Sequence, residues 1–150
     1  MSTTETQHRD KADSSVAGPS GPRAPFTLAV DIGGSRIKAS VLDATGLMTA
    51  ERLVAITPKV PDPKAVIAEI AGLVRRLPDY NRISIGFPGV VRAGVVSTAP
   101  NLGTERWAGF AFADAMAKRF RRPVRMLNDA AVQGLGVVEG PGLECVITLG

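Results

Sequence analysis

The sequence predicts an α/β fold built on a mixed five-stranded sheet, with helices packed on the faces of that sheet. Three β-rich segments lie close together between residues 27 and 56, and short turns join them, so they predict an antiparallel meander. From residue 62 onward, helical and strand patterns alternate, which is typical of parallel strands that are connected through helices. Both strand directions are therefore expected in one sheet.

Length and composition are those of a single water-soluble domain. The chain has 150 residues, of which 45% are hydrophobic and 21% charged, and none of its apolar runs approaches the length of a membrane span. The first 25 residues contain no apolar core of a signal peptide, so we expect a cytoplasmic protein. Cys145 is the single cysteine, which excludes an intrachain disulfide, and its apolar surroundings predict a buried position.

Residues 1–25 are expected to form a disordered tail. They are rich in Ser, Thr, Gly, Pro and charge, and they have too few large apolar side chains to offset the entropy of ordering. The one histidine, His8, lies in this tail without a second His or Cys nearby, so no metal role is predicted for it.

The meander is predicted from three strands, over residues 27–31, 36–42 and 47–56. Gly33 and Gly34 join the first two strands, and residues 43–46, which read Asp-Ala-Thr-Gly, join the second and third. A helix follows, with Asp62 as its N-cap and Pro63 in its first turn. Its predicted buried stripe consists of Val66, Ile67, Ile70, Leu73, Val74 and Leu77.

The alternating part of the chain begins with a strand at residues 82–86, a Gly- and Pro-rich loop, and a short strand at 94–97. A second helical stripe follows and is formed by Phe112, Ala113, Met116, Ala117 and Phe120. We then expect a strand at 124–127, a helix at about 129–138, and a last strand at 144–149.

A polar turn after the first strand is a candidate phosphate site. Gly33 and Gly34 could simply form a hairpin turn, but Asp31, Ser35 and Lys38 surround them. Glycines let backbone N–H groups approach phosphate oxygens, and a carboxylate can hold Mg²⁺. The turn matches neither the GxxxxGK[ST] phosphate loop nor the GxGxxG dinucleotide fingerprint.

A second polar pair, Asn128 and Asp129, follows the strand predicted at 124–127. Both residue types cap helix N-termini, and capping alone would explain the pair. Alternatively, Asp129 is a general base that accepts a proton from an alcohol, and Asn128 binds the same substrate. The two interpretations can hold together.

Four segments in order resemble the ROK family of sugar kinases: residues 30–38, 86–91, 98–102 and 127–131. Residues 86–92 and Trp107 are most similar to the polyphosphate glucokinase branch, although Trp107 is interpreted mainly as a packing or pocket-wall aromatic. The resemblance implies an actin/hexokinase-like (ribonuclease-H-like) lobe. It also implies phosphoryl transfer from polyphosphate or ATP to the 6-hydroxyl of glucose or a related hexose, with Mg²⁺ as cofactor.

The resemblance assigns roles by position. Asp31 would lie near the metal and Gly33 and Gly34 near the transferred phosphate, in a phosphate loop that extends to Lys38. The sugar would contact Gly89, Asn101 and Asn128, and Asp129 would be the base on its 6-hydroxyl. Neither a nucleic acid nor a membrane is expected as a partner, and the complete protein is expected to be a homodimer.

The family continues beyond a strand like the one predicted at 144–149 into a second lobe, so residues 26–150 resemble an N-terminal lobe. Two other interpretations stay open: a ROK transcription regulator, and a non-catalytic sugar-binding half-protein. No helix-turn-helix pattern precedes Phe26, which disfavours the regulator.

A basic cluster is either a solvated helix end or a polyphosphate track, and it comprises Lys118, Arg119, Arg121, Arg122 and Arg125.

Overall fold

A computed structural model describes residues 25–147 of the chain. Residues 1–24 of the predicted tail, which include His8, lie outside the described residues. Residues 148–150 also lie outside them. The described elements are, in chain order, β1 (Thr27–Ile32), β2 (Arg36–Leu42), β3 (Leu53–Ile56), α1 (Pro63–Val74), β4 (Arg82–Phe87), β5 (Val91–Arg92), β6 (Val95–Val96), a 3₁₀ turn η1 (Pro100–Leu102), α2 (Thr104–Trp107), α3 (Phe112–Phe120), β7 (Val124–Asn128) and α4 (Asp129–Leu135).

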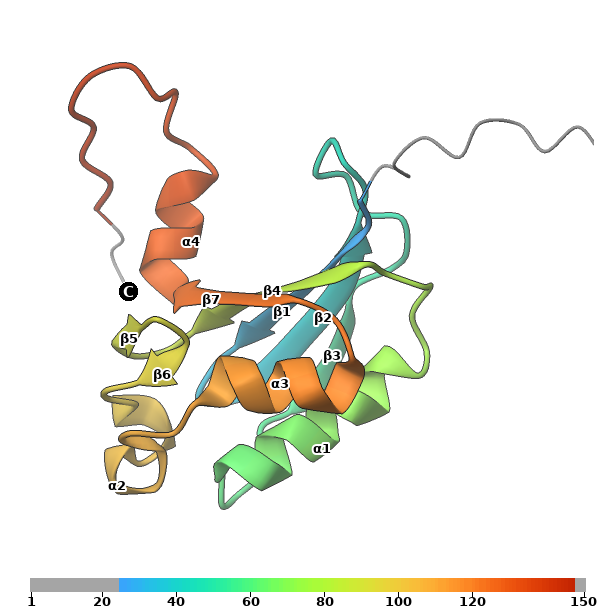
Figure 1. The fold of residues 1–150 in the computed structure, drawn as a ribbon, viewed down its shortest axis with the longest axis vertical. Helices are drawn as coiled ribbons and strands as arrows, with labels where there is room; N and C mark the ends of the chain where they lie inside the picture. Colours follow the sequence, from blue (N-terminus) through green and yellow to red (C-terminus); the bar gives the residue numbers. More distant parts are fainter. Residues whose placement is uncertain (1–24, 148–150) are drawn as a thin grey trace, which may run out of the picture.

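The main sheet has five strands in the order β3-β2-β1-β4-β7 (Figure 1). The pairs β1–β2 and β2–β3 are antiparallel, whereas β1–β4 and β4–β7 are parallel. This topology confirms the predicted mixed sheet, with a meander followed by helix-connected parallel strands. The parallel pairs bring the carboxyl ends of β1, β4 and β7 to one edge of the sheet.

Helices α1 and α3 cover one face of this sheet, and α4 rises on the other side at the end of β7 (Figure 1). Alternation along each strand turns side chains such as Leu28, Val30 and Ile85 into a buried core with Ile70 of α1 and Met116 of α3. Asp62 caps α1 as predicted, because its Oδ1 accepts a hydrogen bond of 2.8 Å from the N–H of Ala65. Among the described residues, no helix is both long enough and apolar enough to span a bilayer.

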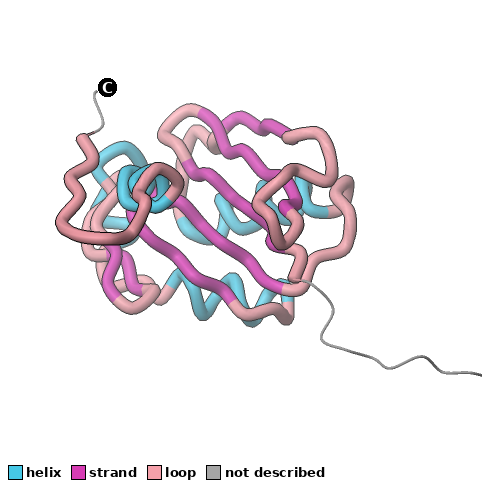
Figure 2. The backbone as a smooth tube through the Cα atoms, turned by 90° about the horizontal axis from the view of Figure 1, so that it is seen from above, coloured by secondary structure: helices cyan, strands magenta, loops and turns pink. Residues whose placement is uncertain are grey.

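The sheet face opposite α1 and α3 carries small and polar side chains. Figure 2 views the strands from this side, with both helices behind them. Ala29 and Ser84 are half-buried there, and Gly86 is buried on β4. These residues are small, so their side chains add little bulk to this face of the sheet.

An aromatic cluster joins the long β4–α3 connection to the core. Trp107 is fully buried, and its ring centroid lies 5.0 Å from that of Phe87 and 5.2 Å from that of Phe112. Its indole N–H donates a 2.7 Å hydrogen bond to the carbonyl of Pro61. The packing interpretation of Trp107 is therefore confirmed. The short strand expected at 94–97 is β6, but η1 and α2 were not predicted.

The prediction of a strand at 144–149 is wrong for residues 144–147, and residues 148–149 lie outside the described residues. No described strand pairs with residues 144–147, and a strand needs a partner for its backbone groups. Cys145 is exposed, which corrects its expected burial.

The third strand is shorter than the predicted 47–56. The carboxylate of Asp43 accepts hydrogen bonds from the N–H groups of Thr45 and Leu47, so the turn continues to residue 47. A single bridge between Leu42 and Met48 follows, and continuous pairing of β3 begins at Leu53.

Candidate active site

The carboxyl ends of three parallel strands place the candidate residues side by side. In the sheet register Asp31 of β1 lies opposite Gly86 of β4, and Phe87 lies opposite Asn128 of β7. Asp129 begins α4 directly after β7. The two polar segments that are far apart in the sequence therefore meet at one edge of the sheet, where a ligand can reach both.

The turn between β1 and β2 is too tightly packed for side chains at its glycines. A Cβ atom on Gly33 would lie 3.0 Å from the carbonyl oxygen of Arg36, and one on Gly34 would lie 3.0 Å from Cβ of Asn101. The N–H of Gly33 donates to the same Arg36 oxygen at 2.9 Å. Gly34 and Ser35 are exposed at the tip of the turn, so their backbone is accessible to a ligand.

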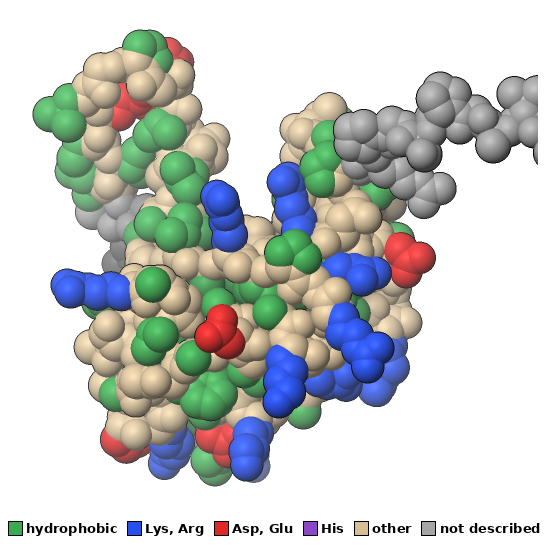
Figure 3. Space-filling view, in the orientation of Figure 1, with side chains coloured by type: hydrophobic (Ala, Val, Ile, Leu, Met, Phe, Trp, Pro, Cys, Tyr) green, Lys and Arg blue, Asp and Glu red, His purple; other side chains and the backbone are tan. Residues whose placement is uncertain are grey.

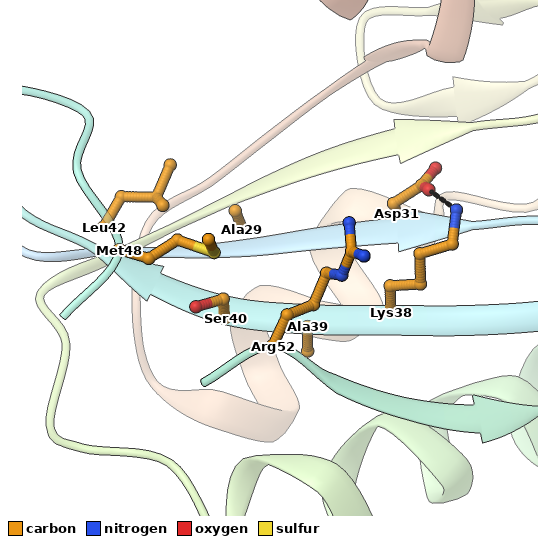
Figure 4. Close-up of a pocket in the computed structure, with 8 residues that line it drawn as sticks. All are labelled: Ala29, Asp31, Lys38, Ala39, Ser40, Leu42, Met48 and Arg52. Atoms are coloured by element: carbon orange, nitrogen blue, oxygen red, sulfur yellow. Dashed lines mark hydrogen bonds and ion pairs between the residues drawn. The ribbon is translucent and has the colours of Figure 1, made fainter. Parts of the chain in front are cut away.

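Lys38 forms an ion pair with Asp31 across the β1–β2 hairpin (Figure 4). Its Nζ lies 2.9 Å from Asp31 Oδ2, and both side chains are about half exposed, so the pair contributes little to stability. They border a recess on the open face of the sheet, into which Arg52 also projects (Figure 4). The pair holds one carboxylate oxygen of Asp31, whereas the other, Oδ1, faces Gly86.

Gly86 keeps a small space free between the carboxylate of Asp31 and the start of α4. A Cβ atom on Gly86 would have Asp129 Cα at 3.7 Å, Asp31 Oδ1 at 3.8 Å and Cγ2 of Val132 at 3.9 Å. Asp31 and the start of α4 therefore border the same point, although they lie almost a hundred residues apart in the sequence. The sequence motif included Gly86, but its position between Asp31 and the start of α4 could not be seen from the sequence.

Asn128 and Asp129 both make capping hydrogen bonds at the start of α4. Asn128 Oδ1 accepts from the N–H of Ala131 at 3.2 Å, and Asp129 Oδ1 accepts from the N–H of Ala130 at 2.8 Å. The capping interpretation of Asn128 is thus confirmed. Within residues 25–147, Asp129 Oδ2 accepts no hydrogen bond, so this oxygen remains available to a substrate.

The loop that contains Gly89 packs against both Asn128 and Thr98. Asn128 Nδ2 donates a 3.1 Å hydrogen bond to the carbonyl of Gly89, and a Cβ atom at Gly89 would overlap the carbonyl oxygen of Thr98. Thr98 Oγ1 in turn accepts from the N–H of Val90 at 3.3 Å. Together with Asn101 beside Gly34, these contacts gather all the predicted sugar residues at the same edge as the phosphate turn.

The residues present fit a magnesium ion. Mg²⁺ keeps several waters and is commonly bound through one or two carboxylates together with substrate phosphates. Asp31 Oδ1 at the Gly86 space supplies such a carboxylate. The described residues contain no group of three or more His, Cys, Asp and Glu side chains that could form an all-protein metal cage.

Two threonines have roles that the sequence analysis did not assign. Thr57, directly after β3, is buried, and its hydroxyl donates to the carbonyl of Gly33 at 2.7 Å. Thr98 shapes the loop at Gly89. Thr57 lies outside every recognised segment, and Thr98 is the first residue of segment 98–102, so only their contacts reveal what each hydroxyl does.

The basic cluster does not form one continuous track. Lys and Arg side chains gather around the end of α3 (Figure 3), but Arg122 Nε donates to the carbonyl of Tyr80 at 2.8 Å. Arg119 borders a recess between α1 and α3, whereas Arg125 borders another at the amino ends of β4 and β7. The cluster therefore divides between two surfaces.

Comparison with known proteins identifies the family. The model of the ROK family matches residues 27–138. The chain belongs to the ROK family. It is 34% identical over 129 residues to a polyphosphate glucokinase from Mycobacterium tuberculosis, a match that covers 81% of this chain and 48% of that protein.

Solved structures of ROK proteins share the fold. An inorganic polyphosphate/ATP-glucomannokinase from Arthrobacter sp. strain KM superposes with a TM-score of 0.68 at 29% identity, covering 74% of this chain and 47% of that one. A ROK family glucokinase from Streptomyces griseus, in complex with glucose and AMPPNP, gives 0.65 at 29% identity, covering 74% and 35%. The actin/hexokinase-like fold is thereby confirmed, and the chain spans about half the length of the curated relatives it matches.

Proposed function

We propose that residues 26–150 form the N-terminal lobe of a two-lobed ROK sugar kinase. The enzyme would transfer a phosphoryl group from polyphosphate or ATP to the 6-hydroxyl of glucose or a related hexose. The observation that carries this proposal is the space over Gly86, which Asp31 Oδ1 and the start of α4 at Asp129 both border. Phosphoryl transfer needs a metal-binding carboxylate and a positioned base near one reacting group.

Asp129 is the proposed general base. The N–H of Ala130 holds its Oδ1 at 2.8 Å and thereby fixes the carboxylate, while Oδ2 is left to accept the proton of the sugar 6-hydroxyl. The alcohol oxygen then attacks the phosphorus as the donor oxygen departs, in line with it. A base of this kind removes the need for a free alkoxide.

Asp31 and the glycine turn form the proposed phosphate side of the site. When bound, Mg²⁺ would neutralise part of the negative charge on the phosphates. Asp31 Oδ1 is the atom that would hold this ion. Backbone N–H groups of Gly34 and Ser35, together with Lys38, would hold oxygens of the transferred phosphate, with Gly33 directly beside them. The accessible tip of the turn supports this role.

The proposed sugar side consists of Gly89, Asn101 and Asn128. The amide of Asn128 uses one N–H for Gly89 and one lone pair of its oxygen for Ala131. One N–H and one lone pair therefore remain for a sugar hydroxyl. Asn128 would thus position the loop and bind the sugar with the same side chain.

Several wider properties belong to the same proposal. The relatives named as polyphosphate glucokinase and polyphosphate/ATP-glucomannokinase support polyphosphate or ATP as donor and a hexose as acceptor. We further propose a cytoplasmic, homodimeric enzyme that has neither a nucleic acid nor a membrane as partner.

Amide NMR on the ¹⁵N-labelled 150-residue chain tests the site directly. Tripolyphosphate with Mg²⁺ should shift the resonances of Gly33–Ser35 and Lys38, and glucose should shift those of Gly89, Asn101 and Asp129. The amide of Gly72 in α1 is an internal control, since α1 lies beneath the sheet, away from the site. Shifts confined to other regions, or none with either ligand, would contradict the proposed function.

A further inference from the structure

We propose that Thr57 is a positioning residue for the phosphoryl donor: its hydroxyl fixes the Gly33–Gly34 peptide so that the N–H of Gly34 is held ready for a phosphate oxygen. This inference rests on the proposed function of the turn. It adds a residue from outside the recognised motifs and assigns a specific atom to it.

Thr57 binds the turn with two hydrogen bonds. Its Oγ1 donates to the carbonyl of Gly33 at 2.7 Å, and its backbone N–H donates to the carbonyl of Ser35 at 3.0 Å. Thr57 as a whole is 6% exposed, so bulk water has little access to replace the hydroxyl. The turn is thereby tied to the end of β3, a strand that it does not itself connect.

The two bonds differ in what they require of the sequence. The bond to Ser35 continues the antiparallel pairing of β2 with β3, in which Arg36 lies opposite Ile56, and any residue other than proline could donate it. The bond to Gly33 requires a side-chain hydroxyl. A β-branched threonine also has a restricted χ1, so its hydroxyl is held in place before any ligand binds.

Peptide geometry passes this constraint to Gly34. In a trans peptide the carbonyl of one residue and the N–H of the next point in opposite directions. Fixing the Gly33 carbonyl toward Thr57 therefore directs the Gly34 N–H away from Thr57. Asn101 packs against Gly34, with its Cβ 3.0 Å from where a Cβ of Gly34 would lie, so the peptide has little room to flip.

A hydrogen-bond donor that is already oriented stabilises phosphate charge better than a mobile one does. A glycine pair has wide conformational freedom, and a free turn would lose that freedom each time a phosphate bound. The Thr57 hydroxyl removes this cost beforehand, because the peptide is already oriented in the ligand-free chain. Donor groups that need no reorganisation are the basis of electrostatic preorganisation.

The test uses the labelled 150-residue chain and the variants Thr57→Val, Thr57→Ala and Thr57→Ser. Val and Ala remove the hydroxyl, and Ser retains it. Without ligand, ¹⁵N relaxation should show Gly33–Ser35 more mobile in the Val and Ala variants than in the wild type. Tripolyphosphate affinity, measured from the turn resonances, should fall about tenfold in both and stay within a few-fold of wild type in the Ser variant.

Thr49→Val is the control for loss of a threonine hydroxyl, because Thr49 Oγ1 also donates to a backbone carbonyl, that of Val41, at 3.0 Å, but outside the turn and at an exposed residue. It should leave tripolyphosphate affinity unchanged. Wild-type mobility and affinity in a folded Thr57→Val or Thr57→Ala chain would overturn the inference while leaving the phosphate site intact. Failure of the wild-type turn to respond to tripolyphosphate would instead refute the proposed function.

Discussion

Asp31 and Asp129 border one small space: Asp31 Oδ1 and Asp129 Cα both come within 4 Å of the point that a Cβ atom at residue 86 would occupy. Neither residue makes this space alone. The parallel register of β1, β4 and β7 brings them together, and Gly86 on β4, which lies between the other two strands, leaves the volume open. Most of the proposed chemistry depends on this arrangement.

Gly86→Ala should separate folding from activity. The new methyl group would make only ordinary contacts of 3.7–3.9 Å, so the unfolding midpoint should change little. The methyl would nevertheless fill the space beside Asp31 Oδ1 and exclude a substrate or metal group from it. Turnover should fall by about tenfold or more, measured in a two-lobed fusion of residues 1–150 with the C-terminal half of the Mycobacterium tuberculosis polyphosphate glucokinase.

The control for this variant is Gly72→Ala, because a Cβ atom on Gly72 of α1 would meet no atom within 4 Å. It should stabilise the helix by about 0.5–1 kcal/mol and leave turnover unchanged. A Gly86→Ala fusion as active as this control would show that the space is not used by the reacting groups.

Gly89→Ala should damage the fold as well as the site. A methyl group at residue 89 would overlap the carbonyl oxygen of Thr98, so the loop must move and its bond to Asn128 must weaken. Overpacking of this kind costs about 1–3 kcal/mol, which denaturant unfolding of the 150-residue chain measures. A stability equal to that of Gly72→Ala would mean that the loop is looser than the contacts indicate.

The turn at residues 43–47 should respond to acid. The hydroxyl of Thr45 and then backbone N–H groups, including those of Thr45 and Leu47, hydrogen-bond the carboxylate of Asp43 and hold its pKa below the usual aspartate value. The ionised carboxylate therefore contributes its full stabilisation of the fold at pH values above the usual aspartate pKa. This contribution is lost as the pH falls through the lowered pKa of Asp43. Thr45→Val should raise the pKa of Asp43, as followed by carboxyl ¹³C NMR, and an unchanged pKa would contradict this cause.

Strand and helix patterns were sufficient to predict the architecture. Short β-rich runs bounded by turn residues located β1, β2, β4 and β7, and the Asp62–Pro63 pair marked the start of α1. Turn chemistry and helical stripes are local properties, so they are readable from one sequence. The same local signals placed the candidate aspartates at strand ends, which is why the parallel register could bring them together.

Properties that depend on distant neighbours were beyond the sequence. The apolar residues 145–147 have strand composition but no described strand to pair with. Thr57 is recognisable only because Gly33 lies next to it in space, and the basic cluster divides because α3 and β7 present its members on different surfaces. Pairing, close approach and side-chain direction are set by tertiary structure, which composition does not record.

Turnover of the Asp129→Asn variant in the two-lobed fusion tests the central claim, that Asp129 accepts the proton of the sugar hydroxyl. Asparagine keeps the size of the side chain and caps a helix as well as aspartate does, so α4 should form normally. It cannot accept the proton, so kcat should fall by about 10²–10⁴-fold while the KM for glucose changes only a few-fold. A kcat close to wild type in a normally folded variant would contradict the account and leave Asp129 as a helix-capping residue.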